Sequence, residues 1–446
     1  MPPAVTDAQG LELSGATSEA ALHYAEAVTA FNFFKGDPMA ALKSATDAAP
    51  DFAMAHLLRA HLLALTTQAD TTAAARRMLD RVQDLPLTDR EAAHLGALQL
   101  LCRGDWTTAA NALGRHLMDT PHDLVALQSA HNMDFFRGDA RELRDRIARA
   151  LPVWADDVPG YSCLLGMYAF GLEEMGDYGR AEAMGREAIE RDARDSWAHH
   201  AVAHVYEMEG RASDGLAWME ARAPHWASDD DYFQTHNWWH KALYCLELDD
   251  PAGALAVYDA HIWAGGDQIV FNLLDASALL WRLWSGGIDV GGRWEALTKA
   301  WGPHLGGTGY GFNDWHAAMA LLGSGAAARV DAMIATLKNA DPDTEAGRWQ
   351  AAITLPLIEG FRAFAEGRHE AAADILFDVR RIAHRFGGSH AQRDVIDWTL
   401  TEAALRGGLS GMARALTDER LALRPHSPVN RAFLARAEAL EAAGRD

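Results

Sequence analysis

The stretch that decides the fold is residues 176–183, GDYGRAEA, in which Gly-Asp is followed a few residues later by Ala. The same phrase occurs at Gly36 (GDPMAAL), Gly104 (GDWTTAA) and Gly138 (GDARELR). Glycine supplies the tight turn that ends one helix, and aspartate caps the helix that follows. Each phrase therefore predicts a hairpin of two helices with alanine at their crossing.

The phrase recurs at a regular spacing. Gly104 and Gly138 are 34 residues apart, and Gly176 and Gly210 are again 34 apart. A period near 34 residues with this sequence motif is typical of tetratricopeptide repeats. We expect an all-α protein of tetratricopeptide-like hairpins forming a curled superhelix, as one domain over residues 1–446 with ten to eleven hairpins. Less complete forms of the motif mark the remaining hairpins, at Gly210, Asp249, Gly286, Gly323, Gly367 and Gly407.

Composition agrees with a helical class and excludes some partners. The chain is 49% hydrophobic, which is ample for a core, and runs of β-branched residues are nearly absent. Its net charge of −22 argues against nucleic acid and anionic membranes as partners. Three widely spaced cysteines fit free thiols, no secretory signal is visible, and no apolar run reaches the roughly 18 residues of a span. We expect a cytoplasmic protein and leave a homodimer open.

Several stretches go beyond a generic repeat, above all AHHAVAHVYEM at 198–208 and HNWWH at 236–240. With GYSCLLGMYAFGLEEMGDYGRAE, LLDASALLWRL, FNDWHAAMAL and GGSHAQRDV, they resemble the tetratricopeptide repeat protein 38 family from about Phe31 to the last repeat. The resemblance implies an α-helical repeat fold in a cytosolic protein. It implies no reaction and no ligand.

Polar side chains gather at particular positions of the predicted first helices. In tetratricopeptide proteins the first helix lines the concave surface, with inward residues about thirteen, ten, six and three before the turn. Applied to Gly210, this rule selects His200, His204 and Glu207, which share one helix face. The other ligand-binding candidates come from the same rule or lie beside residues it selects: His236, Trp239, His240, Asn132, Glu173, Arg393 and Asp394.

Two roles compete for each candidate. His200, His204 and Glu207 form a plausible catalytic set, because a carboxylate can orient and tune an imidazole for acid–base work. The alternative is a set of buried or groove-lining histidines with hydrogen-bond partners. Of Trp238 and Trp239, one suits the core and the other a pocket wall. Arg393 suits a clamp for a substrate carboxylate, whereas Ser389 or Asp394 suits a helix cap.

A metal is not expected. The i, i+4 pairs His200/His204 and His236/His240 have proper ligand spacing, but no HExxH or cysteine pattern accompanies them. We therefore predict no metal and no cofactor.

Two functions remain open: a pocket that binds a small molecule, with acid–base catalysis as a further possibility, and a groove that holds a partner peptide. Peptide-binding repeats commonly present Lys, Arg and Asn, whereas the inward set here is His, Glu, Asp and Trp, so we favour the pocket. Residues 285–312 contain nine glycines and predict a long loop or a broken repeat. We expect this segment to lie across one end of the pocket.

Overall fold

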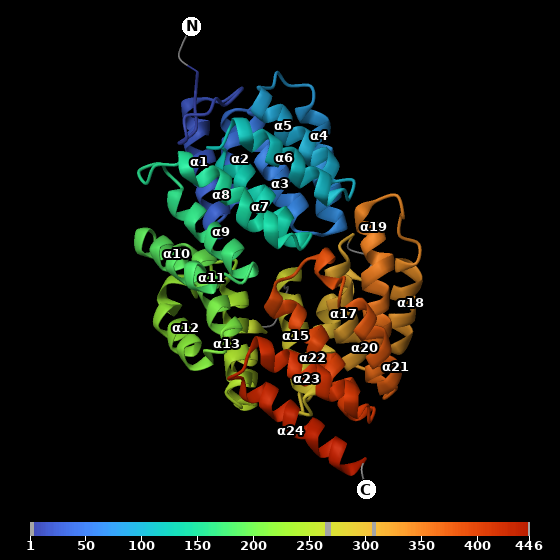
Figure 1. Cartoon of the computed structure of the whole chain (residues 1–446). Helices are drawn as coiled ribbons and strands as arrows, with labels where there is room; N and C mark the ends of the chain where they lie inside the picture. The colour runs from blue at the N-terminus through green and yellow to red at the C-terminus, as the bar shows by residue number, and fades with distance from the viewer. Residues whose placement is uncertain (1–3, 264–268, 306–308, 445–446) are drawn as a thin grey trace. The chain divides into compact units, whose positions relative to one another are not determined.

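The computed structural model describes residues 4–263, 269–305 and 309–444, and these ranges fold almost entirely into helices (Figure 1). By its internal contacts the chain divides into two compact units. The first unit is Met1–Val202, Pro224–Gln234 and Thr344–Ala346; the second unit is Ala203–Ala223, Thr235–Asp343 and Gly347–Asp446. The single domain and the curled superhelix stay predictions. Within the described ranges, no helix is both long and apolar enough to cross a bilayer.

The first unit is a series of helical hairpins. Adjacent helices pack as pairs, α1 with α2, α3 with α4, α5 with α6 and α9 with α10. The helices are α1 (Ser18–Phe33), α2 (Pro38–Ala48), α3 (Ala53–Leu65), α4 (Ala69–Val82), α5 (Asp89–Leu101), α6 (Trp106–Asp119), α7 (Leu124–Phe136), α8 (Ala140–Ala150), η1 (Leu151–Val153), α9 (Tyr161–Glu174), α10 (Tyr178–Arg191) and the start of α11 (Ser196–Met208).

The second unit continues the same pattern, with α15 against α16, α20 against α21 and α23 against α24. Its helices after α11 are α12 (Ala212–Trp226, whose end belongs to the first unit), α13 (Gln234–Glu247), α14 (Pro251–Val257), η2 (Tyr258–Ile262), α15 (Val270–Ser285), α16 (Arg293–Trp301), η3 (Gly302–His304), α17 (Gly311–Gly323), α18 (Ala327–Leu337), α19 (Glu345–Trp349), η4 (Gln350–Thr354), α20 (Leu355–Ala365), α21 (His369–Val379), η5 (Ala383–Phe386), α22 (His390–Arg406), α23 (Ser410–Leu423) and α24 (Pro428–Ala443). The predicted all-α, tetratricopeptide-like fold is confirmed.

The turns lie where the Gly-Asp phrase predicts them. Gly36, Gly104, Gly138, Gly176 and Gly210 all adopt left-handed backbone, with φ between 61° and 89°. A side chain other than hydrogen is strained there, so glycine ends the first helix of these five hairpins. In three later repeats the left-handed residue is the next glycine along the chain, one or two residues after the one chosen from the sequence; these are Gly287, Gly325 and Gly408.

The two helices of a hairpin differ in burial. In α7 every residue except Phe135 is buried, whereas in α8 the buried set is Leu143, Arg146, Ile147 and Ala150, which form one stripe. The first helix of this hairpin is therefore covered on nearly all sides, whereas the second keeps one face in solvent. Polar residues of α7 such as Asn132 are consequently interior, and the concave position of the inward set stays a prediction.

A buried ion-pair network illustrates how such interior polar residues are satisfied. Asp123 is fully buried at the start of α7, where its Oδ1 accepts from the backbone N–H of Ala126. Arg90 donates to both of its oxygens at 2.9 and 3.1 Å, and His94 and His116 lie 3.0 and 2.9 Å from Oδ2. The guanidinium compensates the buried carboxylate, so this cluster of the first unit is structural.

The glycine-rich segment is a broken repeat. Within it, α16 packs against α15 and α17 as the second helix of a hairpin, and η3 follows it directly. The prediction of a long loop is wrong for the described part, because the glycines fall mainly on either side of residues 293–301. Residues 306–308 lie outside the described ranges.

Candidate functional site

Two helices of the second unit bring three histidines together. His204 lies on α11, and His236 and His240 lie one turn apart on α13. One ring nitrogen of each lies within 4.8 Å of the other two. The ring centroids of His204 and His240 are 4.4 Å apart, and those of His236 and His240 are 4.9 Å apart. These three residues are called the histidine cluster below.

Two carboxylates lie behind the histidine cluster. Nδ1 of His236 is 2.9 Å from both oxygens of Asp275 on α15, and Nδ1 of His240 is 3.0 Å from Oε2 of Glu207 on α11. An ionised carboxylate only accepts, so opposite one the Nδ1 carries the hydrogen and Nε2 carries the lone pair of the imidazole.

Burial sets the charge of this region. Desolvation lowers the pKa of His204 and of His240 well below the usual value, and the neighbouring histidines lower it further. Both rings are therefore neutral at pH 7. Burial also raises the pKa of Glu207 to about 7, against the opposing effect of Arg424 and Arg282.

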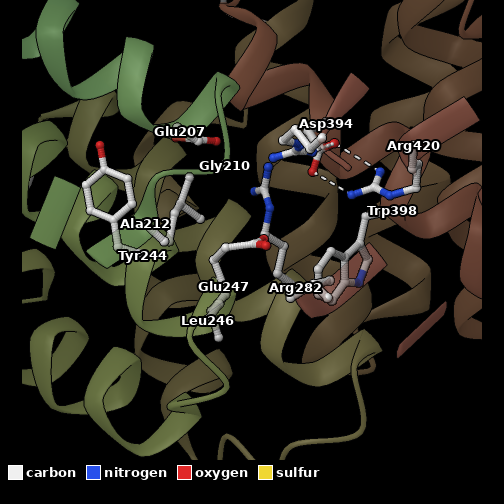
Figure 2. Close-up of a pocket in the computed structure, with 13 residues that line it drawn as sticks. Glu207, Gly210, Ala212, Tyr244, Leu246, Glu247, Arg282, Asp394, Trp398 and Arg420 are labelled. Carbon is white, nitrogen blue, oxygen red and sulfur yellow. Dashed lines mark hydrogen bonds and ion pairs between the residues drawn. The ribbon is translucent and has the colours of Figure 1, made fainter. Parts of the chain in front are cut away.

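A cavity of about 30 Å³ adjoins Glu207 (Figure 2). By the usual space requirement it holds roughly two water molecules. Because Glu207 belongs to its wall and bonds His240, one carboxylate connects the cavity with the histidine cluster. The wall residues are Glu207, Gly210, Ala212, Leu243, Tyr244, Leu246, Glu247, Arg282, Asp394, Trp398, Arg420, Arg424 and Val429. We call this space the arginine cavity.

Asp394 is the paired carboxylate of the arginine cavity. Arg420 donates to its two oxygens at 3.0 and 3.3 Å, the pair joined by dashed lines in Figure 2, and Arg424 donates at 2.7 Å. Although burial raises the pKa of Asp394, the two arginines hold it far below its usual range. Asp394 is therefore ionised at all ordinary pH values.

Arg282 is the unusual cation of the arginine cavity. Its side chain is 3% exposed, and its hydrogen bonds go to backbone carbonyls, at 2.7 Å to Ala391 and 3.4 Å to Ala278. Among the described residues no carboxylate lies within ion-pair distance of it. Burial lowers the pKa of Arg282 to about 10, even though Asp394 and Glu207 act in the opposite direction. Its guanidinium lies over the Trp239 ring, 5.5 Å from the centroid.

Several predicted site residues are in or beside this region. Asp394 and Glu207 line the arginine cavity. Trp239 is fully buried and stacks on His236 at 5.2 Å, whereas Trp238 stacks on His261 at 3.7 Å. Trp239 is thus the interior member of the tryptophan pair.

Arg393 does not line the arginine cavity. Its guanidinium donates to the carbonyls of Gly387 and Gly388, in the loop before α22. Ser389 caps that helix by accepting from the backbone N–H of Gln392. The geometry thus supports the capping role of Ser389. Arg393 binds the loop that precedes the same helix.

Three predicted residues belong to the first unit. His200 lies one turn before His204 on α11, where its ring is 5.4, 5.2 and 5.2 Å from the rings of Phe170, Trp197 and Phe233. Asn132 on α7 and Glu173 on α9 are buried. None of the three lines the arginine cavity.

The inward-residue rule missed four residues of the site. Asp275 and Arg282 carried another signal, a charged side chain inside the apolar runs LLDAS and LLWRLW. Arg420 lies on α23, a second helix, to which the rule does not apply, and Arg424 follows the last residue of that helix. No local pattern marks those two.

The expected lid is not part of the arginine cavity. No residue of 285–305 or 309–312 belongs to its wall, because α16 and η3 complete a hairpin instead. That the segment covers the predicted pocket of inward histidines stays a prediction.

No family model matches the chain. It is similar to a chain of the crystallised APC/C hetero-tetramer Cut9–Hcn1, at 14% identity over 94% of this chain and 76% of that chain, with a TM-score of 0.44. It is also similar to yeast Tom70, at 13% identity over 96% of this chain and 90% of that chain, with a TM-score of 0.34. Both scores are low, so the repeat fold is argued here from the hairpins themselves.

Proposed function

We propose that the second unit binds a small molecule by its carboxylate in the arginine cavity. The observation that carries the proposal is Arg282, a buried guanidinium on the cavity wall to which no carboxylate of the described residues is bonded. A buried charge without a counter-charge is costly, and a guanidinium offers a carboxylate two parallel hydrogen bonds. A ligand carboxylate beside Arg282 would therefore stabilise the folded protein.

The size of the cavity limits the ligand. About 30 Å³ accepts a group such as a carboxylate, and a larger body requires side chains of the wall to move. The interior position of His204 and Trp239, both fully buried, supports an enclosed ligand rather than a peptide in an open groove. We therefore place the peptide scaffold second.

Acid–base chemistry on the bound molecule is part of the same proposal. Glu207 is the candidate for the acid–base group, because it lines the cavity and its Oε2 contacts His240. The ring of His204 contacts the ring of His240, and their centroids are 4.4 Å apart. We expect Glu207→Gln to keep ligand binding but to abolish any conversion of small carboxylic acids that proton NMR detects with the wild type.

A family and a cellular location are also proposed for the protein. Membership of the tetratricopeptide repeat protein 38 family rests on the sequence stretches that resemble it, and the cytoplasmic location rests on composition. Both are proposals beside the repeat fold itself.

Acetate and acetamide provide a matched test of binding, because they have nearly the same size and differ in charge. We expect acetate, titrated at constant ionic strength, to raise the melting temperature and acetamide to leave it unchanged. A ligand at 100 times its Kd stabilises the folded state by about 2.7 kcal/mol. Arg282→Met should abolish the acetate effect, and Arg414→Met, on an exposed ion pair, should preserve it. Equal shifts with acetate and acetamide, or an acetate shift that survives Arg282→Met, would contradict the proposal.

A further inference from the structure

The histidine cluster has the composition of a metal site. Its three ring nitrogens come from His204, His236 and His240 and lie within 4.8 Å of one another. A tetrahedral ion with metal–nitrogen bonds of 2.0–2.1 Å requires nitrogens about 3.4 Å apart. Small rotations of the three rings close that difference.

The carboxylates distinguish this cluster from histidines that simply pack together. Protein metal sites usually pair a ligating imidazole with a carboxylate on its other nitrogen, which fixes the tautomer and aims the ring. Asp275 does this for His236 at 2.9 Å, and Glu207 does it for His240 at 3.0 Å. With Nδ1 of His236 and of His240 held by these carboxyl groups, Nε2 is the nitrogen by which the two rings would bind a metal.

The charges around the cluster suit a divalent cation. Asp275 and Glu207 place a carboxyl group against His236 and against His240. Arg282 opposes a cation near His240, but Asp394 and Glu207 act on that guanidinium with the opposite sign. The first unit offers a contrasting case, His94, His116 and Asp123, where Arg90 already supplies the cation that the carboxylate binds.

From this geometry we propose that His204, His236 and His240 form a binding site for a divalent transition metal of the Zn²⁺ class. Three imidazoles are a ligand set that leaves one position of a tetrahedral ion for water or another small ligand. This site revises the expectation from the sequence. His204 and His236 are 32 residues apart on different helices, so no compact motif such as HExxH announces them. The proposal stands independently of carboxylate binding in the arginine cavity.

The test uses the metal alone on the full chain. Purified protein is stripped with EDTA, checked by circular dichroism and titrated with Co²⁺, whose visible absorption reports tetrahedral coordination, and with Zn²⁺ by calorimetry. We expect one equivalent per chain. His236→Ala, at the least buried of the three ligands, should abolish binding. Asp275→Asn keeps all three ligands and should weaken the Zn²⁺ affinity 10- to 100-fold.

Two histidines outside the site provide controls. His426 is exposed in the second unit, and His116 belongs to the Asp123 network of the first. Binding should be unchanged in His426→Ala and in His116→Ala. The proposal is overturned if the folded wild type shows neither Co²⁺ absorption nor Zn²⁺ heat, or if binding survives His236→Ala. It is equally overturned if His116→Ala removes the metal. None of these outcomes bears on the acetate titration, so each proposal fails by its own experiment.

Discussion

Replacing Arg282 by methionine is the sharpest test of the arginine cavity. Methionine has a similar length and no charge, so the substitution removes the cation while keeping most of the apolar packing. A pKa lowered from 12.5 to about 10 corresponds to about 3 kcal/mol of unfavourable burial of the charge. Methionine relieves that cost.

Two losses oppose this gain. The carbonyl of Ala391 loses its hydrogen-bond donor, which costs about 1 to 3 kcal/mol in a buried place. The contact of the guanidinium with the Trp239 ring contributes about 1 kcal/mol more. The gain and the losses nearly cancel, so we expect Arg282→Met to change the free energy of unfolding by no more than about 2 kcal/mol in either direction.

Arg146→Met provides the matched control. Arg146 is equally buried but donates to both oxygens of Asp134 at 2.7 and 3.0 Å. Breaking a buried pair of this kind costs about 3 to 5 kcal/mol. The free energy of unfolding of both variants is measured by urea titration at pH 7, followed by circular dichroism. Each variant is compared with the wild type in the unfolding transition that its substitution affects. Should Arg282→Met destabilise as strongly as Arg146→Met, Arg282 is a satisfied structural arginine and the cavity loses its binding cation.

Three further predictions concern the first unit. Gly176→Ala should cost about 1 to 2 kcal/mol because its φ is 79°, whereas Gly179→Ala, inside α10 with open space around it, should be neutral or stabilising by up to about 1 kcal/mol; thermal melting of the two variants checks this. Burial raises the pKa of Asp195 to about 8, so the folded protein holds a proton that the unfolded chain releases above about pH 4. Stability should therefore fall as the pH rises from about 4 to about 8, and Asp195→Asn should reduce this fall in urea titrations at several pH values. Asp123→Asn removes the main counter-charge of Arg90 and should cost about 3 to 5 kcal/mol, whereas Asp47→Asn, in an exposed pair with Lys43, should cost less than about 1 kcal/mol; a melting curve unchanged by Asp123→Asn would refute the structural role of the network.

The fold could be predicted from the sequence because its determinants are local. A few consecutive residues are enough to encode a left-handed glycine and the start of the next helix, as at Gly104 and Gly138. The prediction became less accurate where two glycines are adjacent or nearly so. At Gly407 and Gly408 either residue can adopt φ above zero, and only packing selects Gly408.

The site was only partly predictable, because its contacts join distant helices. The offset from the turn selected His204, Glu207 and His236, and the structure places them in one region; that they line a ligand pocket stays a prediction. It could not reveal that Asp275, 39 residues after His236, supplies the carboxylate for that ring. Nor could it show that Arg282 lines the cavity and Arg393 does not.

The unequal burial of the two helices in a hairpin has a consequence for folding. The first helix α7 is almost fully buried, and most of its contacts are with α6 and α8, its neighbours in sequence. Such contacts close short loops, so little chain entropy is lost before each becomes favourable, and folding is expected to be fast for a chain of this length. No hairpin can cover its own first helix, however, so order must spread from one repeat to the next. Amide hydrogens of α7 should consequently exchange with solvent later than those of α8, whose outer face stays hydrated throughout.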